Sequence, residues 1–294
     1  MEQIKLDEIL MNEDPDPAYI VEGLLYQGQM VIVAGEPGVG KSFLQYTLAM
    51  SVAGKLNFLG LPTKAMKVLY FDEENARPDL QQYLRYIWRG LGQPSIPELE
   101  QGLFIQHFAL SAQGANRFQY MAEVASRVQP GLIIVDTVTP VCAIADENDN
   151  AEASRAMRQL RRVKEVAGQQ TAMILLKHSL FSHDQTRRQT IRGAKDWLGS
   201  CDAVWYHKLA VGKPRTDGLK NCRLFPDKVR AFGLRDSLAI TPQWIGAEAS
   251  RGVVLHGSAF ANTAGKSAEL HRSARDVLIT RPNQRRFDVS SGKD

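Results

Sequence analysis

Cysteine is scarce in this chain of 294 residues, which carries only Cys142, Cys201 and Cys222. Their odd number and wide spacing fit neither a disulfide framework nor a set of paired zinc ligands. We therefore expect three ordinary thiols in a reducing compartment.

Long apolar runs are also missing. No stretch of about 18 apolar residues is present, as a membrane-spanning helix would require. The polar first 16 residues lack the basic and then apolar layout of a signal peptide. The sequence therefore predicts a cytoplasmic protein with no membrane partner.

A strong charge of either sign is absent as well, since the formal net charge is only +4. From Ser258 onward the sequence contains seven Lys or Arg and four acidic residues, so this tail alone has a net charge of +3. Such a mild excess is compatible with nucleic-acid binding and equally with a solvated surface. The hydrophobic content of 44% is ordinary for a globular protein, and the length allows one large α/β domain with a buried core.

Apolar runs of strand length alternate with amphipathic runs of helix length. This alternation predicts an α/β fold with a mostly parallel, twisted sheet and helices on both faces. We expect strands at 30–34, 67–71, 103–108, 132–135, 172–176 and 203–207, and helices at 42–52, 78–90, 117–128 and 151–166.

The end of the predicted domain has a different pattern. Two further runs, 220–225 and 229–234, are separated by Pro226 and Asp227 and favour a late antiparallel hairpin. The composition shifts beyond Gly257 to Ser, Ala, Gly and charged residues. We expect an N-terminal extension at 1–18, a core domain at 19–257 and a basic tail or small appendage at 258–294.

One segment between a predicted strand and a predicted helix fills every position of the phosphate-binding loop pattern. It consists of Gly35, Glu36, Pro37, Gly38, Val39, Gly40, Lys41 and Ser42. Glycines let backbone amides turn toward phosphate oxygens, and the following helix contributes its positive end. Lys41 is expected to bridge the β- and γ-phosphates of ATP, Ser42 to ligate Mg²⁺, and Phe43 to belong to the same nucleotide-binding set.

A second magnesium ligand is expected where a buried strand ends. Asp136 follows the apolar run Leu132 to Val135, which would place it at the carboxyl edge of the sheet, where α/β proteins bind ligands. We assign it as the Walker B aspartate; the alternative is an aspartate that caps the next turn. Thr137 comes next instead of a carboxylate, so the water-activating base must come from elsewhere.

Three successive carboxylates, Asp72, Glu73 and Glu74, end another predicted strand. A general base must reach a water in line with the γ-phosphate, and a carboxylate one strand away could do so. The alternative is that these acids form an acidic N-terminal cap of the helix that begins near Pro78. This arrangement resembles the RecA and hexameric-helicase superfamily of P-loop NTPases. The resemblance implies that Glu74 is the catalytic base, with Glu73 as second choice and Asp72 as a supporting group.

A histidine follows the strand at 172–176. His178 matches the position at which RecA-like ATPases carry a γ-phosphate sensor, and replicative helicases of the RepA type have a histidine there. The alternative is a histidine that is merely hydrogen-bonded at a strand end. The resemblance extends to Arg192, which would be an arginine finger acting on a neighbouring subunit, although Ala194 replaces the serine of the family's Arg-Gly-Ser pattern.

Two loops correspond to the DNA-binding loops of RecA-like proteins. The segment 140–150 is acidic through Asp146, Glu147 and Asp149, which argues against strong phosphate contact. The segment 181–190 is basic, with Arg187 and Arg188, and could line a channel for a nucleic-acid strand.

A further basic pair lies in the predicted hairpin. Lys228 and Arg230 resemble the pair that DnaB-like and KaiC-like hexamers insert into a neighbour's ATP site. Both would lie on one face because side chains of a strand alternate with a period of two. Solvated surface residues are the alternative.

The resemblance covers about residues 19–255 and is strongest to the RepA-like subgroup, within the AAA family of ATPases in the broad sense. It implies a homo-oligomeric, hexameric ring that hydrolyses ATP with Mg²⁺ and acts on single-stranded DNA as a replicative helicase or translocase. Two alternatives stay open: a recombination or repair ATPase that acts as a switch, and a KaiC-like signalling ATPase that does not bind DNA.

Overall fold

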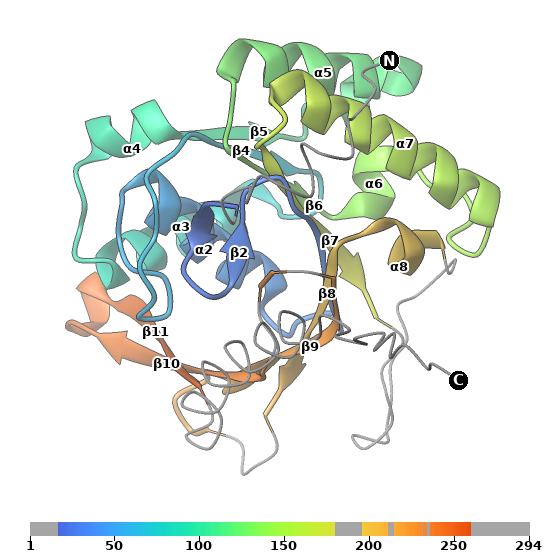
Figure 1. The fold of residues 1–294 in the computed structure, drawn as a ribbon. Coiled ribbons are helices and arrows are strands. Elements are labelled where there is room, and N and C mark those ends of the chain that lie inside the picture. Colours follow the sequence, from blue (N-terminus) through green and yellow to red (C-terminus); the bar gives the residue numbers. More distant parts are fainter. Residues whose placement is uncertain (1–16, 180–195, 211–214, 231, 234–235, 260–294) are drawn as a thin grey trace, which may run out of the picture.

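The computed structural model describes residues 17–179, 196–210, 215–230, 232–233 and 236–259. Nine strands form one sheet in the order β11-β10-β9-β8-β3-β7-β6-β4-β5, and β1 and β2 pair separately (Figure 1). The strands are β1 (Tyr19–Val21), β2 (Leu25–Tyr26), β3 (Met30–Gly35), β4 (Val68–Asp72), β5 (Leu103–His107), β6 (Leu132–Asp136), β7 (Ala172–His178), β8 (Ala203–Leu209), β9 (Cys222–Val229), β10 (Leu238–Ile245) and β11 (Gly252–Ala259).

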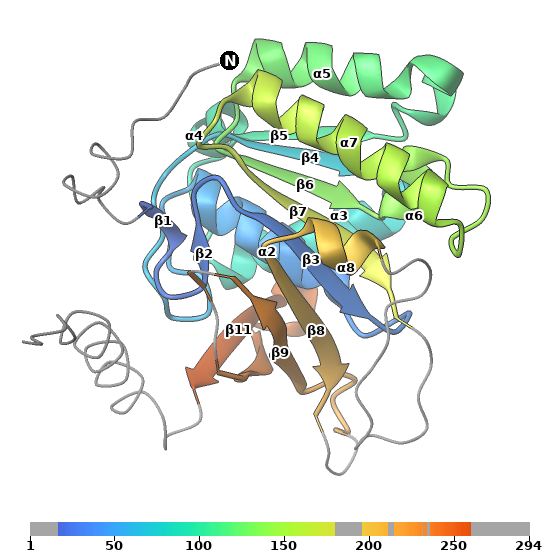
Figure 2. The same cartoon turned by 45° about the vertical axis from the view of Figure 1, so that its right-hand side comes forward.

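Helices cover both faces of this sheet. One face carries α2 (Lys41–Ala53) and α3 (Arg77–Gly90), with α4 (Ile96–Gly102) beside α2 and β5. The other carries α5 (Arg117–Val128), α6 (Val138–Cys142), α7 (Asn150–Ala167) and α8 (Asp196–Ser200), and Figure 2 shows α5 and α7 side by side there. Short 3₁₀ turns lie at Ser111–Asn116 and Glu248–Ser250. None of the described helices is long and apolar enough to cross a membrane.

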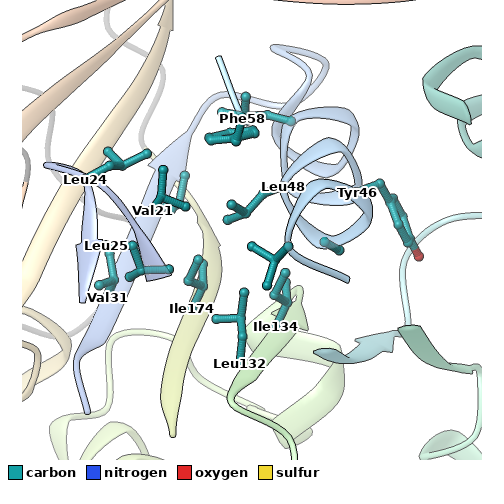
Figure 3. Packing of buried hydrophobic residues seen from close by; sticks show 14 of the residues in the cluster. Val21, Leu24, Leu25, Val31, Tyr46, Leu48, Phe58, Leu132, Ile134 and Ile174 are labelled. Carbon is teal, nitrogen blue, oxygen red and sulfur yellow. The ribbon is translucent and has the colours of Figure 1, made fainter. Parts of the chain in front are cut away.

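The core consists of two clusters because strand side chains alternate between the two faces. In β3, Val31 and Val33 pack toward α2, whereas Ile32 packs toward α5 and α7. Figure 3 shows the α2 side, where Leu48 faces the strand residues Ile134 and Ile174. A parallel sheet buried on both faces explains why its strands are continuously apolar.

The predicted fold class is confirmed: strands β3 to β8 are parallel, and helices cover both faces. The six predicted parallel strands and the four predicted helices are present, with ends that differ by at most two residues. The N-terminal pair β1–β2 and the helices α4 and α6 were missed. These elements are short, and α6 contains Pro140, so periodicity carries little signal there.

The predicted late hairpin is wrong in its location. A single strand, β9, runs through Pro226 and Asp227 and pairs antiparallel with β8, with a register shift beside Trp205. Proline fits because β10 pairs only with Cys222 to Leu224, so Pro226 has no ladder partner on that side. The actual hairpin consists of β10 and β11, which pair antiparallel over their full length.

Glycine is required where α3 meets β11. A Cβ atom at Gly90 would lie 1.9 Å from the carbonyl oxygen of Val253. We predict that Gly90→Ala lowers the free energy of unfolding by about 1–3 kcal/mol, as expected for overpacking. The matched control is Gly199→Ala in α8, where a Cβ would meet no atom within 4 Å. Urea unfolding of both variants tests this, and equal stability of the two would contradict the predicted close packing.

Candidate functional site

The loop between β3 and α2 has the backbone geometry of a phosphate cradle. Gly38 and Gly40 have φ of 70° and 93°, in the left-handed region that side chains disfavour. No side chain caps the N-terminus of α2, which begins at Lys41. The first amide groups of the helix therefore remain available to an anion, and the helix dipole favours negative charge at the same point.

Lys41 lies across this loop with its ammonium group fully engaged. Its Nζ donates to the carbonyl oxygens of Gly35 at 2.9 Å and Glu36 at 3.1 Å, and it lies 3.4 Å from Nδ1 of His178. An ammonium has three donors, so each has a partner. Burial lowers the pKa of Lys41, while the charges of Glu74 and Asp136 oppose that shift.

His178, at the end of β7, connects Lys41 to Glu74. Its Nε2 lies 3.4 Å from a carboxylate oxygen of Glu74, on the opposite side of the ring from Lys41. A neutral imidazole protonated on Nε2 satisfies both contacts, because Nδ1 then accepts from the ammonium and Nε2 donates to the carboxylate. The ring is therefore more than a polar residue at a strand end: it joins the two charged groups of the site.

The three carboxylates at the end of β4, Asp72, Glu73 and Glu74, contact different partners. Asp72 is buried and accepts from the backbone amides of Glu74 and Asn75 at 3.0 Å each, which fixes the turn and fits its expected supporting role. Glu73 turns toward the segment after β5 and accepts from the amide of Leu110. No side chain caps α3, so none of the three acids acts as the helix cap considered as an alternative.

Glu74 is the carboxylate on the side of Lys41. The hydrogen bond from His178 lowers its pKa, burial opposes that shift, and Thr137 and the charge of Lys41 add to the lowering. The side chain is 38% exposed, so water can reach it. A carboxylate that is ionised at neutral pH and open to water has the properties of a general base.

Asp136 lies at the end of β6, directly beside Asp72 in the sheet register. It is fully buried, and burial raises its pKa to about 7, although hydrogen bonds from Tyr70 and Ser42 act in the opposite direction. No side chain caps the N-terminus of α6, so Asp136 does not serve as the turn cap considered as an alternative.

The carboxylate of Asp136 has one engaged oxygen and one orphaned oxygen. Oδ2 accepts from the hydroxyl of Tyr70 at 2.7 Å. Oδ1 is buried and has no partner in hydrogen-bond geometry within the described chain, although Ser42 lies close enough to help lower the pKa of the group. A hydroxyl and an unsatisfied carboxylate oxygen are hard oxygen ligands, so Ser42 and Asp136 fit Mg²⁺.

Two stacked tyrosines that the sequence analysis missed support these carboxylates. Tyr46 of α2 and Tyr70 of β4 stack with ring centroids 4.0 Å apart. Tyr46 donates to Asp72 at 2.6 Å, whereas Tyr70 donates to Asp136. The signal was present: Tyr70 precedes Asp72 by two residues on the same strand face, and Tyr46 lies one helical turn beyond Ser42.

The acidic loop at 140–150 uses its charges locally. Asp149 accepts from the amide of Ala151 and caps α7, while Asp146 accepts from the amide of Asn148. Glu147 accepts from the hydroxyl of Thr139 and lies 3.8 Å from the buried ammonium of Lys177. These acids therefore stabilise the loop, and their role in repelling phosphate stays a prediction.

The remaining predicted residues lie away from Lys41 or outside the described residues. Lys228 and Arg230 do share one side, as expected, but both donate to carbonyl oxygens at the end of α8: Lys228 to Leu198 at 2.6 Å and Arg230 to Gly199 at 2.9 Å. They lie beside the start of β8, whereas the phosphate loop follows the far end of the neighbouring strand β3. Arg192 and the basic loop at 181–190 lie outside the described residues.

Comparison with known proteins agrees with this geometry. Residues 2–180, more than half of the chain, match the family described as AAA domain (AAA_25). No curated protein matches the sequence. Among solved structures, a KaiC-like protein from the hyperthermophilic archaeon Pyrococcus horikoshii OT3 superposes with a TM-score of 0.50 at 15% identity, covering 81% of this chain and 93% of that one. The chain belongs to the AAA domain family, and its sheet and phosphate loop have the fold of a RecA-like P-loop NTPase.

Proposed function

We propose that this chain hydrolyses ATP with Mg²⁺ and uses the cycle to drive a ring-forming motor on single-stranded DNA. The observation that carries the hydrolytic part is the line of contacts from Lys41 through His178 to Glu74. It supports the proposal because it joins Lys41, proposed to bind the phosphates, to His178, the proposed sensor, and to Glu74, the proposed base.

Each group has a distinct task in the proposed reaction. Lys41 exchanges its carbonyl partners for phosphate oxygens and offsets negative charge on the transferring phosphoryl group. Ser42 and Asp136 would hold Mg²⁺, which would neutralise negative charge on the phosphates. Glu74 accepts a proton from the attacking water. His178 senses whether the γ-phosphate is present, because its ring already contacts both Lys41 and Glu74.

The proposed motor needs a positive charge that reaches this site from a neighbouring subunit. Within the described residues, no arginine forms a hydrogen bond or an ion pair with Glu74, Asp136 or His178. We propose that the missing charge is the finger Arg192 of a neighbouring subunit in a homo-hexamer of RepA-like type. The sequence that follows His178 contains Arg187 and Arg188, which would connect the sensor to the DNA strand.

Other uses of the same ATPase core stay open. A KaiC-like signalling ATPase that does not bind DNA is the second candidate. The likeness to the KaiC-like protein, at 15% identity, shows the fold alone. A recombination or repair ATPase that switches between filament states is the third. The signalling ATPase differs from the motor because single-stranded DNA does not stimulate its hydrolysis. The recombination or repair ATPase differs because it pairs duplex strands without processive unwinding.

We predict that Lys41→Ala abolishes nucleotide hydrolysis and that Glu74→Gln lowers the turnover rate about 10²–10⁴-fold while leaving ATP binding intact, because only the base is lost. Glu73→Gln is the matched control, since that carboxylate faces Leu110. Steady-state phosphate release and nucleotide titration measure the two properties. Wild-type turnover by Glu74→Gln would remove this residue as the base.

We predict that Tyr70→Phe raises the Mg²⁺ concentration needed for half-maximal ATPase activity about tenfold, because loss of a supporting hydrogen bond typically weakens metal binding by that order. Tyr46→Phe is the matched control: it removes the hydroxyl from the other ring of the stack, which bonds to Asp72. Mg²⁺ titrations of the rate test this. Equal Mg²⁺ requirements in the two variants would show that Tyr70 does not position Asp136.

We predict that single-stranded DNA stimulates ATP hydrolysis strongly at low salt and less at higher salt, because phosphate contacts release counterions. Arg192→Ala should lower the stimulated rate about 10³-fold, the lower end of the range for an arginine finger. The ATPase rate is measured with and without DNA at two salt concentrations. Hydrolysis that ignores DNA at both would contradict the motor and favour the signalling alternative.

A further inference from the structure

The sheet ends in an edge strand, β11, that lacks the usual protection against pairing with another strand. Within the described residues β11 pairs with β10 alone, along its full length and without a register shift (Figure 1). It contains no Lys, Arg, Asp, Glu or Pro. Sheet edges in natural proteins are usually very short, charged, bulged or interrupted by proline, because an open row of backbone N–H and C=O groups recruits other chains. β11 has none of these features.

The inner face of β11 is covered, whereas its edge is open along most of the strand. Its first two residues are buried where α3 packs on them, but residues 254–258 are partly or fully exposed. Leu255 packs with the core on the α2 side, and a Cβ atom at Gly257 would lie 2.6 Å from the carbonyl oxygen of Leu59. In the described part of the chain, no backbone hydrogen bond joins β11 to an element other than β10.

The opposite edge strand, β5, is better protected. It has only five residues, and α4 packs against it. Its Gln106 accepts from the hydroxyl of Tyr120 in α5 at 2.7 Å. A short, flanked strand is a poor template for pairing, so the lack of protection is specific to β11.

The chain that continues from β11 contains one run with the character of a strand. It is Val277 to Thr280, which has charged residues on both sides and is followed by Pro282. Its valine, isoleucine and threonine are β-branched, which favours a strand, and the proline would end that strand. An apolar run of this kind left in water is itself prone to pair with other chains. Pairing of the run with β11 would therefore remove two hazards together.

We propose that residues 276–281 of this chain pair with residues 254–258 of β11 as a further strand that closes the sheet. The connecting residues 260–275 can extend over roughly 50 Å, about twice the length of β11, so the run reaches the edge in either direction. A tether of this kind gives an effective concentration on the order of millimolar, which favours the chain's own tail over a second copy. This inference does not depend on the proposed ATPase function.

Hydrogen exchange of the full chain tests the pairing. The amides at 254–258 that point away from β10 should exchange slowly, and Ile279→Pro should make them exchange about tenfold faster, because proline removes a donor and disrupts the added strand. Thr263→Pro, in the connecting residues, is the matched control and should leave the exchange unchanged. Fast exchange of these amides in the unaltered chain, or slow exchange that Ile279→Pro leaves unchanged, overturns the inference.

Thiol reactivity gives a second readout that needs no proline, and it decides the question if Ile279→Pro fails to fold. The three native cysteines are buried, so a thiol placed in the tail is the accessible one. Leu278→Cys and Ile279→Cys should differ about tenfold in reaction rate, because neighbouring residues of a strand point to opposite faces and only one face would lie over α3 and Leu59. Thr263→Cys gives the rate of an unpaired thiol. Equal, fast reaction of all three variants overturns the inference.

Dilution separates the chain's own tail from that of a second copy. Protection of residues 254–258 by the same chain is independent of protein concentration, and we expect equal exchange rates after a tenfold dilution. Protection that is lost on dilution would assign the edge to a neighbouring copy and overturn the inference. None of these measurements requires ATP or DNA, so failure of the proposed motor would leave the result unchanged.

Discussion

The contact of His178 with both Lys41 and Glu74 depends on the register of parallel strands. Gly35 at the end of β3 pairs with His178 at the end of β7, and Asp72 of β4 pairs with Asp136 of β6. Because these strands are parallel and adjacent, their carboxyl ends bring the phosphate loop, His178, Glu74 and Asp136 to one end of the sheet. A slip of one residue in any pair would turn the corresponding side chain to the other face.

Two buried carboxylates lie side by side at this end of the sheet, and the neighbouring side chains donate hydrogen bonds that stabilise them. Asp72 and Asp136 are both fully buried, yet the stacked tyrosines and Asn75 supply donors to them. Of the oxygen atoms of these two carboxylates, Oδ1 of Asp136 has no hydrogen-bond partner within the described part of the chain. Isolated buried charges are costly, so a cation at that point would stabilise the ionised carboxylate and the site together.

Much of this could be predicted from the sequence because local patterns dominate in a parallel α/β domain. Buried strands are continuously apolar, and the phosphate loop has a fixed spacing, so the positions of Lys41 and Asp136 followed directly. Side-chain directions could not be predicted in the same way. The separation of Glu73 from Glu74 depends on a turn that Asp72 organises through backbone amides, and a string of three acids does not reveal it.

The later strands were harder for a related reason. Proline normally ends a strand, yet Pro226 lies inside β9 because β10 does not pair with that part of β9, which pairs only with β8 on its other side. Whether a strand end has a neighbour is a property of the whole sheet, and no window of sequence contains it.

The arrangement of β7 connects the site to the rest of the chain. Ala172, Ile174 and Leu176 pack on the α2 side and Met173 and Leu175 on the other, so His178 and its neighbour Lys177 face opposite sides of the sheet. Lys177 lies 4.8 Å from the ring centroid of Trp197 in α8 and forms an ion pair with Glu147 of the loop after β6. A backbone shift at His178 would therefore also displace the buried ammonium of Lys177, which contacts α8 and the loop after β6. Breaking a buried pair is costly, so such a shift favours joint movement of these elements over independent movement.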